Sequence, residues 1–376
     1  GPFSTIKLND VPEPTLLSDQ WVKVKTRVCG YCGSDQSLIF LKDSPTASPF
    51  TSFPCIIGHE ISGEIVETGT AVKTLKKGDR IAIAPHLNCV TRGIKELCNA
   101  CRNGDVGSCE NVAKGDFSAG MFIGICKDIG GGFAPTMIAH ESQVFKLPDS
   151  ITFKEGALIE PLTVGLQAVW NNRPHPDDEI LVIGGGVIGT MVIQAIRGLG
   201  IDCRITVAEP SAFHADLSKK VGADKIISNG DIYSAATEIS GAERYKPLLG
   251  NDILMGGYNK VFDTVGTSET LNLAMRCMAV RGVLSIIGIG HDVKLDLTPL
   301  WLKLQTLKGV YSYGYIDVGG VTKHIYEVAI DLIIQKKVTL SDLVTHTFPL
   351  DHFDKMIELN MAKGRHQAIK TAIAFD

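Results

Sequence analysis

The fold of this chain is decided by the stretch Ile180-Leu181-Val182-Ile183-Gly184-Gly185-Gly186-Val187-Ile188-Gly189. An apolar run leads directly into the glycines, and a helical pattern follows over 190–199. A buried strand that passes through a glycine turn into a helix is the opening unit of a parallel α/β sheet. Gly184 permits the tight turn, Gly186 lets a ligand approach the backbone, and Gly189 lets the helix pack closely on the strand.

The same stretch predicts a dinucleotide site. A lone G-x-G-x-x-G is weak evidence, but here a strand precedes it, a helix follows, and Glu209 stands twenty residues after Gly189. Backbone N–H groups at the helix start, from Val187 and Ile188, would face the pyrophosphate. The Glu209 carboxylate would accept ribose hydroxyls and repel a 2′-phosphate, and no arginine follows over 210–213, so we expect NAD rather than NADP. The alternative is a solvated acid beside a structural turn.

Helices and strands alternate from about residue 151, which predicts a doubly wound parallel sheet. Helical patterns cover 152–170 and 212–221, and strands are expected at 180–183, 204–208, 260–264 and 283–287. Residues 244–260 look irregular, because Pro247 and several glycines interrupt them, and they suggest no function. Further on, helices at 323–335 and 353–362 flank a strand at 344–348, and the chain closes on 367–375.

The first part of the chain, about 3–150, has a different texture. Alternation of β-branched and polar residues, as in 21–26 and 64–67, is interrupted by glycine and proline and predicts strands and turns. A chain of 376 residues exceeds what one hydrophobic core usually supports. We therefore expect two domains, one mostly β and one α/β.

Composition excludes several classes of protein. A net charge of -4 gives no general attraction to nucleic acid or anionic membranes. The longest uncharged apolar stretch, 180–196, has 17 residues and four glycines, which is too short for a membrane span. The ten cysteines are clustered rather than evenly spread, which favours metal ligation in a reducing cytoplasm over a secreted disulfide scaffold. The start shows no signal peptide, and Gly1-Pro2 is typical of a protease scar.

Two short segments carry the chemistry. Cys32-Gly33-Ser34-Asp35 precedes Gly58-His59-Glu60 in the sequence. A thiolate and an imidazole, with carboxylates near, can hold one Zn²⁺ and leave one coordination position open for a reactant.

The pattern G-H-E-x2-G-x5-G-x2-V, from Gly58 to Val72, resembles the signature of zinc-dependent medium-chain alcohol and polyol dehydrogenases, the group of sorbitol, threonine and archaeal glucose dehydrogenases. The resemblance extends over nearly the whole chain. It implies a GroES-like, mostly-β catalytic domain over 1–158, a Rossmann NAD-binding domain over 159–320, and a return of 321–376 to the catalytic domain.

The resemblance also implies the catalytic zinc ligands. Cys32 and His59 match the motif, and Cys29 would be a small packed residue. The segment 156–162, with Glu160 before Pro161, resembles the E-P-L segment that carries a carboxylate ligand in the polyol branch, so Glu160 is preferred as third ligand, with Glu60 as the alternative.

Two further side chains would support these ligands. Asp35 would accept a hydrogen bond from the far nitrogen of His59, unless it only caps a helix. Ser34 would pass the hydroxyl proton of the substrate toward the cofactor ribose. Ser37 stands where the family usually ends this relay with histidine, so the relay would end in water or in another histidine.

A second metal site is expected in a lobe at about 89–110. Cys98, Cys101 and Cys109 match three ligands of the structural zinc lobe in the resembled family, and Cys89 is the nearest fourth, since position 95 is lysine. The alternatives are an empty reduced lobe or a zinc knuckle that binds nucleic acid. Four basic and four acidic residues between 89 and 116 argue against the knuckle.

These features predict a zinc-dependent NAD dehydrogenase that oxidises a secondary alcohol of a polyol, a sugar or a similar small molecule. The alternatives are an amino-alcohol dehydrogenase of the threonine type, an idle crystallin-like cofactor-binding protein, and a zinc-free quinone reductase. The substrate depends on the loops at 40–53 and 113–122, where Phe50, Phe53, Phe117 and Phe122 suggest an apolar wall. The resemblance implies a homodimer or homotetramer.

Overall fold

The computed structural model describes residues 5–228, 231–288 and 292–376. Contacts between Cα atoms divide it into two compact units. Unit 1 contains 1–163, 312–334 and 340–376, and unit 2 contains 164–311 and 335–339. Relative to the boundaries expected from the sequence, 159–163 and 312–320 lie in unit 1, and 335–339, expected to return to the catalytic domain, lies in unit 2.

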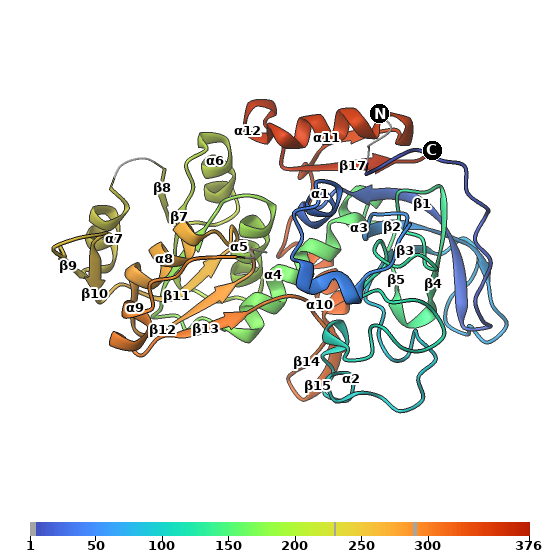
Figure 1. Cartoon of the computed structure of the whole chain (residues 1–376), viewed down its shortest axis with the longest axis horizontal. Helices are drawn as coiled ribbons and strands as arrows, with labels where there is room; N and C mark the ends of the chain where they lie inside the picture. Colours follow the sequence, from blue (N-terminus) through green and yellow to red (C-terminus); the bar gives the residue numbers. More distant parts are fainter. Residues whose placement is uncertain (1–4, 229–230, 289–291) are drawn as a thin grey trace. The chain divides into compact units, whose positions relative to one another are not determined.

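Unit 1 is built on a seven-stranded sheet in the order β16-β17-β1-β2-β3-β5, with β4 paired to β1 (Figure 1). Its pairings are antiparallel except for β16 with β17. The strands are β1 (Trp21–Gly30), β2 (Glu60–Thr68), β3 (Arg80–Ile83), β4 (Thr136–His140), β5 (Val144–Lys146), β16 (Val344–Phe348) and β17 (Lys370–Ala374). Val22, Val24 and Val28 alternate with more exposed residues along β1, so one face of this strand packs into the core, as the sequence predicts.

Short helices surround this sheet and a small hairpin joins it. The helices are α1 (Gly33–Ile39), η1 (Pro45–Phe50), α2 (Asn99–Arg102), η2 (Val106–Ser108), η3 (Glu141–Gln143), α3 (Phe153–Ala157), α10 (Ile325–Ile334), η4 (Leu350–His352), α11 (Phe353–Met361) and α12 (Lys363–His366). The hairpin consists of β14 (Tyr315–Val318) and β15 (Val321–His324). The helix expected at 323–335 therefore begins only at Ile325, because the residues before it pair with β14.

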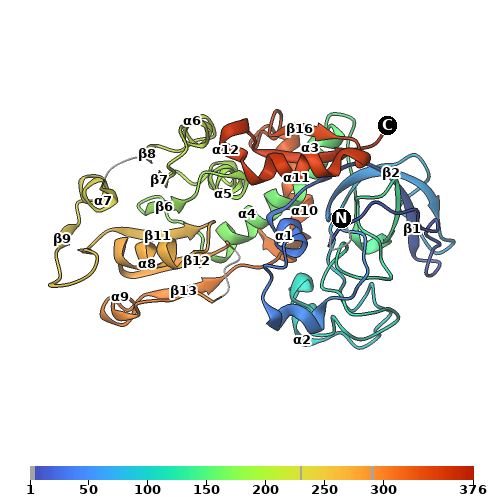
Figure 2. The same cartoon turned by 45° about the horizontal axis from the view of Figure 1, so that its top comes forward.

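Unit 2 contains the expected parallel sheet, in the order β13-β12-β11-β6-β7-β8. The strands are β6 (Glu179–Ile183), β7 (Arg204–Ala208), β8 (Lys225–Ile227), β11 (Tyr258–Asp263), β12 (Met278–Ile286) and β13 (Thr306–Gly309). The helices are α4 (Ile159–Asn171), which begins in unit 1, α5 (Val187–Gly198), α6 (Ala212–Lys220), α7 (Ile232–Ser240), α8 (Ser268–Cys277) and α9 (Thr298–Leu302). Helices cover both faces of this sheet (Figure 2). The chain runs outward from β6 first in one direction and then in the other, which is the doubly wound order of a dinucleotide-binding fold.

The prediction that 244–260 is irregular is wrong in part. Strands β9 (Glu243–Tyr245) and β10 (Ile253–Met255) form an antiparallel hairpin there, and β11 begins at Tyr258. Leu254 is fully buried in the core of unit 2, and Arg244 forms ion pairs with Asp231 and Asp252. Tertiary burial and ion pairing hold a hairpin that the local sequence does not favour.

Candidate active site and second cysteine site

Three of the predicted ligands converge in unit 1. One ligand atom from each of Cys32, His59 and Glu60 lies within 4.8 Å of the others. Cys32 follows β1 and precedes α1, whereas His59 and Glu60 stand at the start of β2. The β1–β2 ladder places Gly30 opposite Glu60 and thereby brings the two segments together. We call Cys32, His59 and Glu60 the open site.

Gly58 is required by the backbone at this point. Its φ is +95°, which glycine adopts readily. A Cβ at this position would lie 2.7 Å from Phe133 Cδ1 and 2.8 Å from Cys29 Sγ. Cys29 is fully buried against this turn, in agreement with its expected packing role. The position immediately before His59 therefore requires glycine.

The two ring nitrogens of His59 face different partners. Nδ1 lies 3.4 Å from Asp35 Oδ1, a distance at which the pair attracts without a well-formed hydrogen bond. Nε2 lies 3.5 Å from Ser34 Oγ. Burial lowers the pKa of His59, but Asp35 and Cys32 together raise it well above its usual range. Asp35 also accepts a hydrogen bond from the Cys32 backbone N–H at 2.9 Å, so it both caps α1 and faces the imidazole.

Glu60 is held by a lysine that the sequence analysis missed. Lys370 Nζ, on β17, donates to Glu60 Oε1 at 2.5 Å and to the Tyr31 carbonyl at 3.3 Å, and both charged side chains are almost fully buried. Glu60 Oε2 has no hydrogen-bond partner among the described residues. A Cβ on Gly30 would lie 2.0 Å from this oxygen, so Gly30 provides its space. A buried carboxylate oxygen without a donor, beside a thiol and an imidazole, fits a zinc site.

Glu160, the third ligand preferred from the sequence, is not a member of the open site as the structure has it. It lies at the start of α4, and its Oε1 accepts a hydrogen bond from the Tyr313 hydroxyl at 2.9 Å. Burial raises the pKa of Glu160 to about 7, and the charges of His59 and Glu60 also act on it. Glu160 is therefore a close neighbour of the open site, and the choice between Glu60 and Glu160 as ligand stays a prediction.

Phe122 is the aromatic residue of the expected apolar wall that contacts the open site. Its ring centroid lies 5.0 Å from that of His59. Phe117 is instead buried under the Arg92 guanidinium, and Phe50 and Phe53 are exposed. Of these four phenylalanines, Phe122 is the one whose ring contacts His59.

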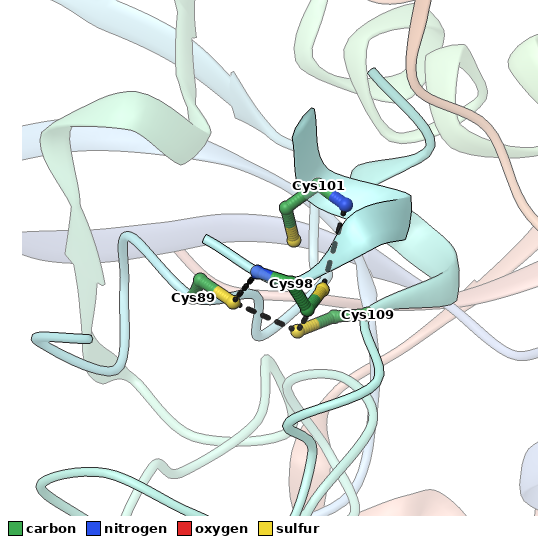
Figure 3. Close-up of side chains that lie close together, drawn as sticks. All are labelled: Cys89, Cys98, Cys101 and Cys109. Atoms are coloured by element: carbon green, nitrogen blue, oxygen red, sulfur yellow. Dashed lines mark hydrogen bonds between the residues drawn. The ribbon is translucent and has the colours of Figure 1, made fainter. Parts of the chain in front are cut away.

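Cys89, Cys98, Cys101 and Cys109 form a second group, shown in Figure 3, with sulfur atoms within 4.8 Å of one another. Cys89 Sγ lies 3.6 Å from Cys109 Sγ, so the longer loop after Cys89 does not prevent the fourth cysteine from joining the others. The Asn111 side chain donates to Cys89 Sγ at 3.3 Å, and the backbone N–H of Cys98 donates to the same sulfur at 3.4 Å. Buried sulfurs that already receive N–H donors suit thiolates, and four thiolates fit a tetrahedral zinc. We call these cysteines the closed site.

The longer loop is held by Arg92, one of the four basic residues between 89 and 116. This side chain is fully buried, and its guanidinium lies over the Phe117 ring, 4.4 Å from the centroid. It donates to the backbone carbonyls of Leu87, Lys114, Phe117, Ser118 and Gly120. One guanidinium therefore ties both ends of the closed-site lobe together.

In unit 2 the glycine loop has the expected geometry. Gly184 has φ +91°, and a Cβ on Gly189 would lie 1.9 Å from the Gly184 carbonyl oxygen, so helix α5 packs directly on the turn. A Cβ on Gly186 would meet nothing within 4 Å. Space above Gly186, next to the N-terminus of α5 at Val187, suits a ligand with a phosphate group.

Glu209 closes this loop from the end of β7. Its Oε2 accepts from the Gly185 N–H at 2.7 Å and its Oε1 from the Ser211 N–H at 2.7 Å. The carboxylate is thus fixed beside the glycines, and each oxygen keeps a lone pair for a further donor.

Similarity to known proteins identifies the family to which this chain belongs. The model for the alcohol dehydrogenase GroES-like domain matches residues 18–149, and that for the zinc-binding dehydrogenase domain matches 187–335. The chain is 30% identical over 352 residues to (R,R)-butanediol dehydrogenase of Bacillus subtilis, covering 91% of this chain and 92% of that protein. It is 27% identical over 353 residues to L-idonate 5-dehydrogenase of Vitis vinifera, covering 94% and 87%.

A solved structure of 2R,3R-butanediol dehydrogenase from Bacillus subtilis has the same fold, with a TM-score of 0.76 at 24% identity over 98% of this chain and 96% of that one. The fold and the matched domains define an oxidoreductase with a GroES-like and a Rossmann-like part. The chain belongs to the zinc-dependent medium-chain alcohol and polyol dehydrogenase family. Among the described residues, no helix has the length and apolar character to cross a membrane.

Proposed function

We propose that this protein transfers a hydride between NAD and a secondary alcohol of a polyol, a sugar or a similar small hydroxylated compound. The convergence of Cys32, His59 and Glu60 is the observation that carries this proposal. Relatives named sorbitol dehydrogenase, L-idonate 5-dehydrogenase and (R,R)-butanediol dehydrogenase support the substrate class.

Zinc bound at the open site would supply a Lewis acid that polarises the substrate oxygen. Cys32 and His59 would hold it, together with Glu60 or Glu160. Asp35, facing Nδ1 of His59, would keep a proton on that nitrogen and leave Nε2 free to ligate. Ser34, whose Oγ faces Nε2, is placed to take the hydroxyl proton of the substrate. The end of this proton relay, with Ser37 in place of histidine, stays a prediction. The closed site would hold a second, structural zinc.

A panel of substrates tests this function. We expect NADH formation, followed by its absorbance, with at least one polyol, aldose or vicinal diol. Preference for an amino alcohol would favour the threonine-type alternative. NAD binding without turnover of any polyol, aldose, amino alcohol or simple alcohol would favour the idle crystallin-like alternative and contradict the proposal.

The preference for NAD over NADP depends on Glu209. The Glu209→Ala variant is expected to lower kcat/KM for NAD about tenfold or more, since it removes hydrogen bonds to a charged acceptor worth roughly 1.5–3 kcal/mol. The same change removes repulsion of a 2′-phosphate, so kcat/KM for NADP should rise.

Steady-state kinetics with both coenzymes measure the ratio of kcat/KM for NAD to kcat/KM for NADP. The matched control is Asp202→Ala, an exposed acid in the turn before β7 that faces no glycine loop. An unchanged ratio for Glu209→Ala would remove this residue from the ribose site. A similar fall in the preference of Asp202→Ala for NAD over NADP would indicate a general effect of removing a negative charge.

A homodimer or homotetramer is supported by an uncovered apolar edge of unit 2. Among the described residues, β13 pairs only with β12, so its other side is open. Trp301, Leu302 and Leu304 beside it are exposed by 65%, 48% and 58%. Open strand edges and apolar patches of this kind are normally covered by a partner. Sedimentation should therefore give the mass of two or four chains.

Cytoplasmic location is proposed for a chemical reason. All ten cysteines are free thiols, and a four-cysteine zinc site requires its thiols to stay reduced.

A further inference from the structure

The closed-site lobe packs tightly against a segment that is distant in the sequence. A Cβ on Gly107, two residues before Cys109, would lie 1.5 Å from Ser312 Oγ. A Cβ on Gly314 would lie 2.1 Å from the Gly104 carbonyl oxygen, and that oxygen accepts from the Tyr315 N–H at 2.9 Å. Figure 1 shows α2 of the lobe beside β14 and β15. The lobe therefore fixes the backbone of 312–315, and all of these residues belong to unit 1.

Tyr313 lies in the middle of this clamped segment and is almost fully buried. Its ring packs edge-on against His86, with centroids 4.5 Å apart, and His86 Nε2 is 2.9 Å from Ser312 Oγ. With ring and backbone both held, the hydroxyl has a defined position. It donates to Glu160 Oε1 at 2.9 Å.

Glu160 in turn lies where it can affect the open site. Ser62, two residues after Glu60 on β2, donates to the Phe153 carbonyl at 2.6 Å. A Cβ on Gly156 would lie 2.9 Å from Ser62 Cβ, so the segment that leads into Glu160 packs on the strand that bears Glu60. A carboxylate on the first turn of α4 could rotate away from the open site if its hydrogen bond were lost. The Tyr313 hydroxyl is the donor to the Glu160 carboxylate among the described residues.

We propose that Tyr313 is a positioning residue that couples the closed site to the open site by holding Glu160 in place. The proposal rests on the proposed function, because it assumes zinc in both sites. In this proposal the four cysteines of the lobe keep Tyr313 in position. Tyr313 in turn keeps Glu160 in position near the open site. Such a coupling requires a contiguous set of rigid contacts, and the route Cys109, Gly107, Ser312, Tyr313, Glu160 is contiguous in the structure.

The rate of zinc release to a chelator tests the coupling without any substrate. The open-site phase is identified with Cys32→Ala, which should keep only the closed-site zinc. We expect Tyr313→Phe to accelerate open-site release about tenfold, the order of the effect of one hydrogen bond to a charged group, and to leave closed-site release unchanged. Tyr315→Phe is the matched control, because its hydroxyl makes no hydrogen bond among the described residues and its release rates should not change.

A double-mutant cycle tests the direction of the coupling. Cys109→Ser should also accelerate open-site release, and the double variant Cys109→Ser/Tyr313→Phe should release no faster than the more affected single variant. Gly107→Ala should displace Ser312 while it keeps all four cysteines. We expect this variant to accelerate open-site zinc release as well.

The coupling would be overturned if the two substitutions multiplied their effects on open-site zinc release in the double variant. It would also be overturned if Tyr313→Phe released this zinc at the unchanged rate. Both results would leave the proposed function intact. A wild-type protein with no open-site zinc would overturn the coupling and the proposed function.

Discussion

Cys32→Ala is expected to abolish NAD reduction and to leave one zinc ion per chain, where we propose two for the unsubstituted protein. The Cys32 thiolate would be the soft zinc ligand of the open site. Because Lewis-acid polarisation is worth several kcal/mol, the loss in kcat/KM should be about a thousandfold or more. Zinc content is measured by elemental analysis of the purified variant, and kcat/KM is measured on the best alcohol of the substrate panel.

Two control variants show whether the loss of zinc and of activity is specific to Cys32. Cys29→Ala removes a buried thiol three residues earlier that packs against Gly58, and it should keep both zinc ions and most of the activity. Cys109→Ser should remove the other zinc, from the closed site. Retention of two zinc ions by Cys32→Ala, or loss of zinc from Cys29→Ala, would contradict the ligand assignment.

Lys370→Met is expected to destabilise the zinc-free protein by about 3–5 kcal/mol, the usual effect of removing one partner from a buried ion pair. Lys370 and Glu60 are 2% and 1% exposed, so the Glu60 carboxylate would remain buried without its cation. Burial lowers the pKa of Lys370, but Glu60, Cys32 and Glu160 together raise it above its usual value, so the ammonium stays charged in the folded state. Denaturant unfolding of metal-stripped protein measures the free energy.

A second substitution separates charge from packing. Adding Glu60→Gln to Lys370→Met removes the unpaired charge and should restore much of the lost stability. A cost below about 1 kcal/mol for Lys370→Met would mean that solvent or another cation satisfies Glu60. Equal instability of the single and double variants would place the effect in packing.

Local patterns predicted much of this protein. The strand at 344–348 and the strand at 204–208 lie where the alternation places them, as β16 and β7. The glycine positions in the turn at 184–189 were readable because positive φ and close helix contact leave glycine as the residue that fits. Cys32 and His59 could be paired because both belong to short motifs with set spacing.

Other features depend on contacts between distant residues and left no local signal. Leu254 and Arg244 turn a stretch rich in glycine into a hairpin through burial and ion pairs. Arg92 reads as an ordinary surface charge in the sequence, but five carbonyls that converge in space give it a buried site. A search for charged residues inside otherwise apolar strands could have pointed to Lys370, which stands in the run from Ala368 to Ala374.

The sequence alone determined the class of this protein, because backbone sterics and metal chemistry demand particular residue types at short, regular spacings. Only the tertiary structure decided where the two carboxylates lie, since Glu60 is held beside Cys32 and His59 by Lys370, 310 residues away, and Glu160 is held by Tyr313, 153 residues away. Hydrogen bonds between buried side chains depend on distances across the fold, and no spacing along the chain encodes those distances.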